Sequence, residues 1–273
     1  MNAPIHRHGK GGEACCIAVP VAALRRAPDA CAEQVSQGLF GERLAILETL
    51  GEWRRVRLAH DGYEGWLRAD DIAPVPGPAS HVVAVPQTLL FPAPDIKSTP
   101  VRPLYMGSRL MTQPMAGNRR FLATRLPDGG EGYVVASHAI PAGARQEDPA
   151  SVAERLLHAP YLWGGRTMAG IDCSGLVQLA LMMCGHVGIP RDSGDQMQNV
   201  GEPLPSETAL SGQLRRGDLV FWKGHVAMAL ESDRLIHANA HHMMVAIEPV
   251  NEAIQRIANS GSGPVLAVRR PYP

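Results

Sequence analysis

The first half of the chain repeats itself, and this repeat restricts the folds open to it. Five residues recur in the same order 66 positions later: Pro20, Pro28, Asp29, Gly41 and Arg43 match Pro86, Pro94, Asp95, Gly107 and Arg109. Gly65 and Gly132 are 67 positions apart, so one residue is inserted on the way. A series of turn residues in one order indicates a duplicated structural unit. We therefore expect two copies of one small unit.

Each copy contains short runs of strand-forming residues, such as "RLAIL", "WRRVRLA" and "GYEGWLR" in the first. Glycine, proline and Asp-Gly turn signals separate these runs, which is typical of a small β-barrel. The predicted barrels span residues 15–75 and 80–141, after a polar N-terminal tail over residues 1–14. The segments "APVPGPAS" and "PAGARQEDPA" are rich in proline and small residues, so we expect them to be linkers.

The pattern changes in residues 145–273. "DPASVAERLLHA" and "CSGLVQLALMMCG" predict helices, and they precede strand-like runs that include "DLVFW", "HVAMALE", "RLIHAN", "VAIEPV" and "VLAVRR". Helices followed by a series of strands indicate an α+β domain. The fold class expected for the 273 residues is therefore multidomain, with two β-barrels followed by an α+β domain.

Charge and cysteine content exclude several classes of function. The 26 basic and 26 acidic residues balance, which disfavours nucleic acid or an anionic membrane as a partner. The start of the sequence has no apolar run of signal-peptide length, so we expect a soluble cytoplasmic protein. The five cysteines form neither a disulfide framework nor a zinc motif, so no metal and no cofactor is predicted.

Cys173 occupies a position suited to a nucleophile. Asp172 can cap the predicted helix, which leaves Cys173 in its first turn among unpaired backbone N–H groups. The helix dipole would favour a thiolate there, and a backbone N–H could stabilise an oxyanion. The alternative is that Cys173 is a small buried apolar residue, as we expect for Cys184.

A cysteine nucleophile needs a base, and two histidines are suitably placed. His225 opens the strand "HVAMALE", and His237 closes the next strand, "RLIHAN". In an antiparallel hairpin these two ends lie side by side, so one imidazole could orient the other. Either histidine could instead be a hydrogen-bonded strand residue, and a metal site lacks a third ligand.

The motifs of the last domain, taken in order, resemble those of the NlpC-type cysteine peptidases, which are papain-like enzymes that cut peptidoglycan stem peptides. These motifs are "PYLWGG", "DCSGLVQ", "RDSGDQ", "RRGDLVFW", "GHVAMAL" and "IHAN". The resemblance implies that Cys173 is the nucleophile, His225 the general base and His237 the orienting residue. It also implies that Tyr161 helps to hold the oxyanion.

The pattern "G-E-x-L-x-I-L … G-x-W-x-x-V … D-G-Y-x-G-W-L" resembles bacterial SH3 domains, of which the second copy is the more divergent. Two such domains before an NlpC-type domain resemble the γ-D-glutamyl-L-diamino acid endopeptidases of the dipeptidyl-peptidase VI type. The resemblance implies release of L-Ala-γ-D-Glu from murein peptides with a free amino terminus, during murein recycling. It implies five substrate-binding residues: Tyr63, Glu33, Asp172, Ser174 and Asp192.

Two other functions remain open. The chain could be a cell-wall endopeptidase that acts on polymeric murein, with the SH3 units as wall anchors. It could also be a binding module that captures peptides without turnover. Each substrate-binding residue also has a structural alternative, for example Tyr63 as barrel packing and Asp172 as a helix cap only.

Overall fold

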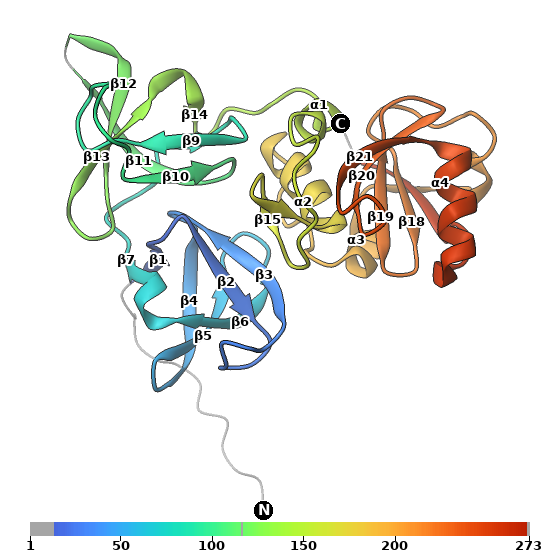
Figure 1. The fold of residues 1–273 in the computed structure, drawn as a ribbon, viewed down its shortest axis with the longest axis horizontal. Helices are drawn as coiled ribbons and strands as arrows, with labels where there is room; N and C mark the ends of the chain where they lie inside the picture. Colours follow the sequence, from blue (N-terminus) through green and yellow to red (C-terminus); the bar gives the residue numbers. More distant parts are fainter. Residues whose placement is uncertain (1–13, 116, 272–273) are drawn as a thin grey trace, which may run out of the picture.

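The computed structural model describes residues 14–115 and 117–271, arranged as two β units and one α+β unit (Figure 1). The tail predicted for residues 1–14 lies outside the described residues, apart from residue 14. Within the described part, no helix has the length and apolar character needed to cross a membrane.

The first β unit is a seven-stranded antiparallel sheet in the order β3-β2-β6-β5-β4-β1-β7, in which β1 lies between β4 and β7. Its core holds Ile17, Leu24, Val56, Leu58 and Leu67, all buried. Its strands are β1 (Cys15–Ile17), β2 (Val21–Arg25), β3 (Gln34–Leu39), β4 (Arg43–Leu50), β5 (Trp53–Leu58), β6 (Glu64–Arg68) and β7 (Ile72–Pro74). A short 3₁₀ turn, η1 (Ala69–Asp71), precedes β7.

The second β unit repeats this order of elements. It comprises β8 (His81–Val83), β9 (Gln87–Leu90), β10 (Arg102–Tyr105), β11 (Arg109–Met115), β12 (Asn118–Arg125), β13 (Glu131–Val135), η2 (Ala136–His138) and β14 (Ala139–Pro141). Individual hydrogen bonds recur as well: Gly41 N–H donates to Ile17 C=O, and Gly107 N–H donates to Val83 C=O. The two copies found in the sequence therefore have the same order of elements and equivalent backbone hydrogen bonds.

The repeated glycine is required by the backbone. Gly41 has φ +74° and Gly107 has φ +91°, a backbone conformation that residues other than glycine rarely adopt. A Cβ at Gly41 would lie 2.1 Å from the backbone oxygen of Arg109, so the two β units also approach each other here. The Arg109 N–H donates to the Phe40 carbonyl at 2.8 Å across the same junction.

The α+β unit has a six-stranded antiparallel sheet with helices on both faces (Figure 1). The helices are α1 (Pro149–Glu154), α2 (Cys173–Met183), α3 (Ser193–Asn199) and α4 (Val250–Ile257), with 3₁₀ turn η3 (Ser206–Ala209) and π-turn η4 (Ala258–Ser262). The sheet order is β17 (Glu202–Leu204), β22 (Ala267–Arg270), β18 (Leu219–Trp222), β19 (His225–Ala229), β20 (Arg234–Asn239) and β21 (Met244–Pro249). A hairpin of β15 (Arg166–Thr167) and β16 (Gly170–Ile171) precedes α2. The α+β prediction agrees with this arrangement.

Two local predictions differ from the structure. The helix predicted over residues 148–159 ends at Glu154, because the chain turns away to pair with β21: His158, with φ +68°, donates its N–H to Val245 C=O. His237 does not close its strand, since β20 continues to Asn239.

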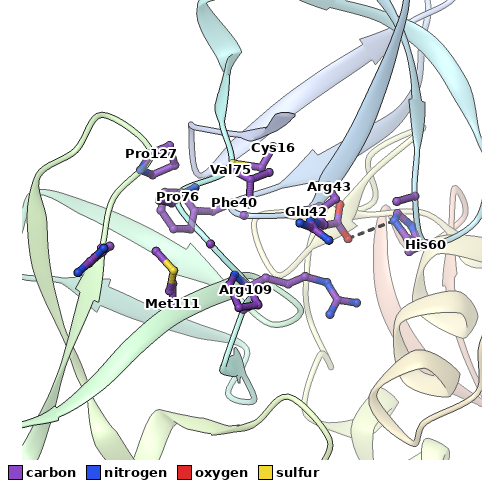
Figure 2. A pocket seen from close by; sticks show the side chains of 16 residues that line it. Cys16, Phe40, Glu42, Arg43, His60, Val75, Pro76, Arg109, Met111 and Pro127 are labelled. Carbon is purple, nitrogen blue, oxygen red and sulfur yellow. Dashed lines mark ion pairs between the residues drawn. The ribbon is translucent and has the colours of Figure 1, made fainter. Parts of the chain in front are cut away.

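A cavity of about 350 Å³ lies between the two β units (Figure 2). Its lining includes Phe40, Glu42, His60 and Arg109, and none of the described lining residues comes from the α+β unit. This cavity is therefore separate from the site around Cys173. In the wall of the cavity, Glu42 Oε1 lies 3.6 Å from His60 Nδ1. Glu42 also binds Arg166 and so connects the cavity to the α+β unit.

Candidate active site

Cys173 is the first residue of α2, as predicted, and Asp172 is the N-cap. The Asp172 carboxylate accepts a hydrogen bond from Gly175 N–H at 2.7 Å. In the part of the chain that the structure describes, the backbone N–H of Cys173 has no hydrogen-bond acceptor. A free donor beside a thiol is the arrangement that an oxyanion hole needs.

The Cys173 thiol is not the thiolate that the sequence suggested. Burial, followed by the nearby Asp172 carboxylate, raises the pKa of the thiol to about 12, although the Val226 and Ser174 amides oppose this shift. The helix start therefore does not outweigh desolvation in the substrate-free site. The thiol needs a base to remove its proton.

Three residues on neighbouring strands form a hydrogen-bonded series. His225 Nε2 lies 2.8 Å from His237 Nδ1, and His237 Nε2 lies 2.6 Å from Glu248 Oε1. The register places His237 opposite Ala246, and alternation puts these residues on the sheet face that α4 covers. The three side chains meet diagonally across β19, β20 and β21, a separation that long side chains can span.

The charges in this series are fixed by burial and by Arg256 on α4. Despite partial burial, hydrogen bonds from His237 and Arg256 lower the pKa of Glu248 to about 2. Burial lowers the pKa of His225 to about 3, and it also lowers the pKa of His237. At neutral pH the site therefore holds two neutral imidazoles and one carboxylate.

The Asp172 carboxylate accepts hydrogen bonds from residues outside α2 as well as from the helix that it caps. Arg191, almost fully buried, binds both carboxylate oxygens at 2.9 and 2.6 Å. Gly164 N–H, Gly175 N–H and the Ser174 hydroxyl donate to the same carboxylate. Five donor groups saturate the lone pairs of one carboxylate, so Asp172 has no acceptor left for a substrate ammonium.

Tyr161 and Ser174 both lie beside the nucleophile. Burial raises the pKa of the Tyr161 hydroxyl to about 12, and the adjacent Cys173 contributes to the shift. Tyr161 is held by its N–H, which donates to Met243 C=O at 2.9 Å. The Ser174 hydroxyl accepts a hydrogen bond from Arg191 at 2.9 Å. Tyr161 thus stays protonated and can donate.

The first β unit supplies residues to the same region. The Tyr63 hydroxyl donates to the Asp192 carboxylate, at 3.3 Å from Oδ2. The Trp163 indole N–H donates to Glu33 Oε1 at 2.9 Å, and Arg26 binds the other oxygen of Glu33 at 2.6 Å. The sequence-predicted residues Tyr63, Glu33 and Asp192 are therefore brought together from two units far apart in the chain.

A buried ion pair fixes the first β unit to the α+β unit. Arg166 is fully buried and forms a two-pronged contact with Glu42, at 2.9 and 3.0 Å. Its other donors reach Gln37 C=O and Gln178 Oε1, and Gln178 lies in α2. The helix that carries the nucleophile is thus tied directly to the first β unit.

Sequence reasoning missed the partners of the predicted residues: Arg191, Glu248, Arg256, Arg166 and Glu42. Arg191 stands in the motif "RDSGDQ", and Glu248 interrupts the apolar strand "VAIEPV". A charged residue at an inward strand position is a signal that could have identified Glu248. Among the described residues, no group of three or more His, Cys, Asp or Glu side chains could hold a metal ion.

The fold and the Cys-His-His arrangement define a cysteine peptidase. A profile of the NlpC/P60 family matches residues 158–258, and a profile of the bacterial dipeptidyl-peptidase SH3 domain matches residues 24–72. The chain belongs to the NlpC/P60 family, and it carries an SH3-like domain before the peptidase domain.

Known proteins resemble the chain over most of its length. Dipeptidyl-peptidase 6 of Lysinibacillus sphaericus is 30% identical over 250 residues, which cover 85% of this chain and 90% of that protein. Gamma-D-glutamyl-L-lysine dipeptidyl-peptidase of Bacillus subtilis is 26% identical over 247 residues, covering 82% and 79%. A crystal structure of an NlpC/P60 family protein from Bacillus cereus has the same fold, with a TM-score of 0.78, 21% identity, and coverage of 95% and 100%.

Proposed function

We propose that this peptidase hydrolyses the amide bond between γ-D-Glu and the diamino acid of murein peptides that have a free N-terminal L-Ala, releasing L-Ala-γ-D-Glu for murein recycling. The observation that carries the proposal is the contact of Tyr63, from the first β unit, with Asp192, the N-cap residue of α3. This contact closes one side of the site with acidic and hydroxyl groups. The name of the Bacillus subtilis relative, gamma-D-glutamyl-L-lysine dipeptidyl-peptidase, supports the same bond type.

In the proposed reaction, His225 acts as general base. Its Nδ1 takes the thiol proton as Cys173 Sγ bonds to the γ-carbonyl carbon. The C–N bond then breaks, and His225 returns the proton to the leaving amine of the diamino acid. Water attacks the resulting thioester while His225 accepts its proton. The C–S bond then breaks, His225 returns the proton to the Cys173 sulfur, and the dipeptide leaves with a new carboxylate. The Cys173 backbone N–H and the Tyr161 hydroxyl stabilise both oxyanions.

The substrate ammonium is assigned to Asp192, Tyr63 and Glu33. In the described part of the chain, the Asp192 carboxylate accepts a hydrogen bond from Tyr63 alone, and desolvation raises the pKa of this carboxyl group. An ammonium would relieve that cost. Asp172 and Ser174, predicted to contact the amine, instead position Arg191 and the loop before the nucleophile. In the proposal they shape the site without binding the ammonium.

We also propose that the second β unit is a diverged SH3 domain that braces the other two units. Its support is the recurrence of backbone contacts: Arg25 pairs with Trp66 in the first unit, and Phe91 pairs with Tyr133 in the second. Arg155 of the α+β unit donates to Ala84 C=O, which joins the second unit to the peptidase domain.

Product analysis of L-Ala-γ-D-Glu-diaminopimelate and its N-acetylated form tests the proposed specificity. We expect L-Ala-D-Glu from the free peptide and at least about 100-fold lower kcat/KM for the acetylated one, because acylation leaves the acidic groups unpaired. Equal rates on both peptides would instead favour an endopeptidase of polymeric murein. Binding without any product would indicate a capture module.

Replacing Asp192 with asparagine should lower kcat/KM for the free tripeptide by about 10- to 100-fold, mostly through KM, because a charge-assisted hydrogen bond is lost. The preference for the free over the acetylated peptide should shrink by the same factor. Asp195→Asn is the matched control, since Asp195 is an exposed acid on the same helix. An unchanged preference in Asp192→Asn would refute the assignment.

A further inference from the structure

A buried acid beyond the two histidines has no role in the reaction described so far. Glu248 is 8% exposed and accepts from His237 Nε2 at 2.6 Å. Arg256 binds both of its oxygens, Nη2 to Oε1 at 2.5 Å and Nε to Oε2 at 3.2 Å. His242 Nδ1 lies 3.7 Å from the same Oε1. A buried carboxylate with this set of donors is ionised and can only accept hydrogen bonds.

Because Glu248 can only accept a hydrogen bond, it determines which ring nitrogen carries the proton, first in His237 and then in His225. Because Glu248 accepts from His237 Nε2, the neutral His237 carries its proton on Nε2, and its Nδ1 is an acceptor. His237 Nδ1 therefore needs a donor, and His225 Nε2 lies 2.8 Å away. The neutral His225 then carries its proton on Nε2 and has a lone pair on Nδ1. No hydrogen-bond partner of His225 Nδ1 occurs in the described part of the chain, and the Val226 N–H next to this ring contacts the Cys173 thiol.

We propose that Glu248 is a positioning residue that sets the tautomer of the general base from two rings away, so that His225 presents an unprotonated Nδ1 to the Cys173 thiol. The opposite tautomer would direct an N–H at the thiol and could not accept its proton. Glu248 never touches substrate, so it acts through His237 and His225 alone. This inference rests on the proposed peptidase function.

Glu248→Gln is the sharpest variant, because it keeps the shape of the side chain. In either orientation of the glutamine amide, its NH₂ group faces an N–H of Arg256. When the NH₂ group also faces His237, it donates to His237 Nε2, so the protons on both imidazole rings move to the other nitrogen. We expect kcat to fall roughly 10- to 100-fold with KM changed less than about 3-fold, since the tautomer and not substrate binding is altered. Glu248→Asp keeps the charge and should recover part of kcat. Glu252→Gln, an exposed acid in the first turn of α4, should behave as wild type.

Two further readouts separate tautomer control from a loss of packing. Nitrogen NMR of His225 should show an unprotonated Nδ1 in the wild type and a protonated Nδ1 in a large fraction of Glu248→Gln. The rate profile of the variant should stay flat between about pH 5 and 8, because burial keeps the pKa of His225 low. A variant that merely loosens the site would hydrate His225, so an acid limb would appear near pH 6.5.

The rate at which iodoacetamide alkylates Cys173, measured on the peptide that contains it, provides a readout without murein substrate. His225 takes the thiol proton as the S–C bond forms and iodide leaves, so Glu248→Gln should slow this reaction as well. If Glu248→Gln slows alkylation but the wild type does not hydrolyse the tripeptide, the proposed function is overturned and the role of Glu248 stands. Unchanged alkylation and NMR spectra, or a new acid limb near pH 6.5, would overturn the role of Glu248.

Discussion

Hydrolysis should fall by about 10⁴-fold or more when Cys173 is replaced with alanine, because no other group can form the thioester. The thiol lies at the start of α2, so the substitution removes the nucleophile while the Asp172 cap of the helix stays in place. Rates on the free murein tripeptide, followed by mass spectrometry of the released dipeptide, measure the loss.

Cys184→Ala is the matched control, since Cys184 is the C-cap of the same helix and lies away from the histidines. Its rate should stay within about twofold of wild type. Residual hydrolysis by Cys173→Ala at more than a hundredth of the wild-type rate would point to another nucleophile.

The free energy of unfolding should drop by about 3–5 kcal/mol in Arg166→Met, because the substitution leaves Glu42 buried without a counter-charge. Despite complete burial, Arg166 and His60 keep the pKa of Glu42 lowered in the native protein. The stabilisation from this pair should therefore be present above the ordinary pKa of a glutamate and be lost as the pH falls through the lowered value. Denaturant titration at several pH values tests both statements.

Two variants separate the ion pair from general effects of the substitution. Arg43→Met removes an exposed arginine that has no ion pair among the described residues, and it should cost less than about 0.5 kcal/mol. Arg166→Met combined with Glu42→Gln should recover at least about 1 kcal/mol, because the buried charge is gone. A double variant no more stable than Arg166→Met would contradict the ion-pair explanation.

The predictions that succeeded depended on local signals. Turn glycines at a constant spacing predicted two similar β units, and the Asp172 cap predicted where α2 begins. An antiparallel hairpin, in which the start of one strand lies beside the end of the next, was enough to predict that His225 and His237 meet. Each of these signals depends on backbone geometry within a few residues, which sequence pattern reports directly.

The predictions that failed concerned electrostatics and long-range contacts. The thiolate expected at Cys173 is absent because burial by distant segments outweighs the helix dipole. Asp172 seemed free to bind an amine, yet Arg191 occupies it, and Arg191 is itself held by Ser36 of the first β unit. No motif near Asp172 contains that information.

The sequence alone was enough to predict the order of the units, the position of Cys173 at the start of α2 and the meeting of the two histidines, because these follow from turns, a helix cap and an antiparallel hairpin. Only the tertiary structure decided which acidic side chain pairs with which basic side chain. Glu42 of the first copy reaches Arg166, whereas the second copy has Ser108 at the equivalent position and cannot form this pair. Arg191 and Ser36 are 155 residues apart, and Glu248 reaches His237 only through strand register. A charge pair forms where packing removes water from both groups, and that depends on segments that no local pattern connects.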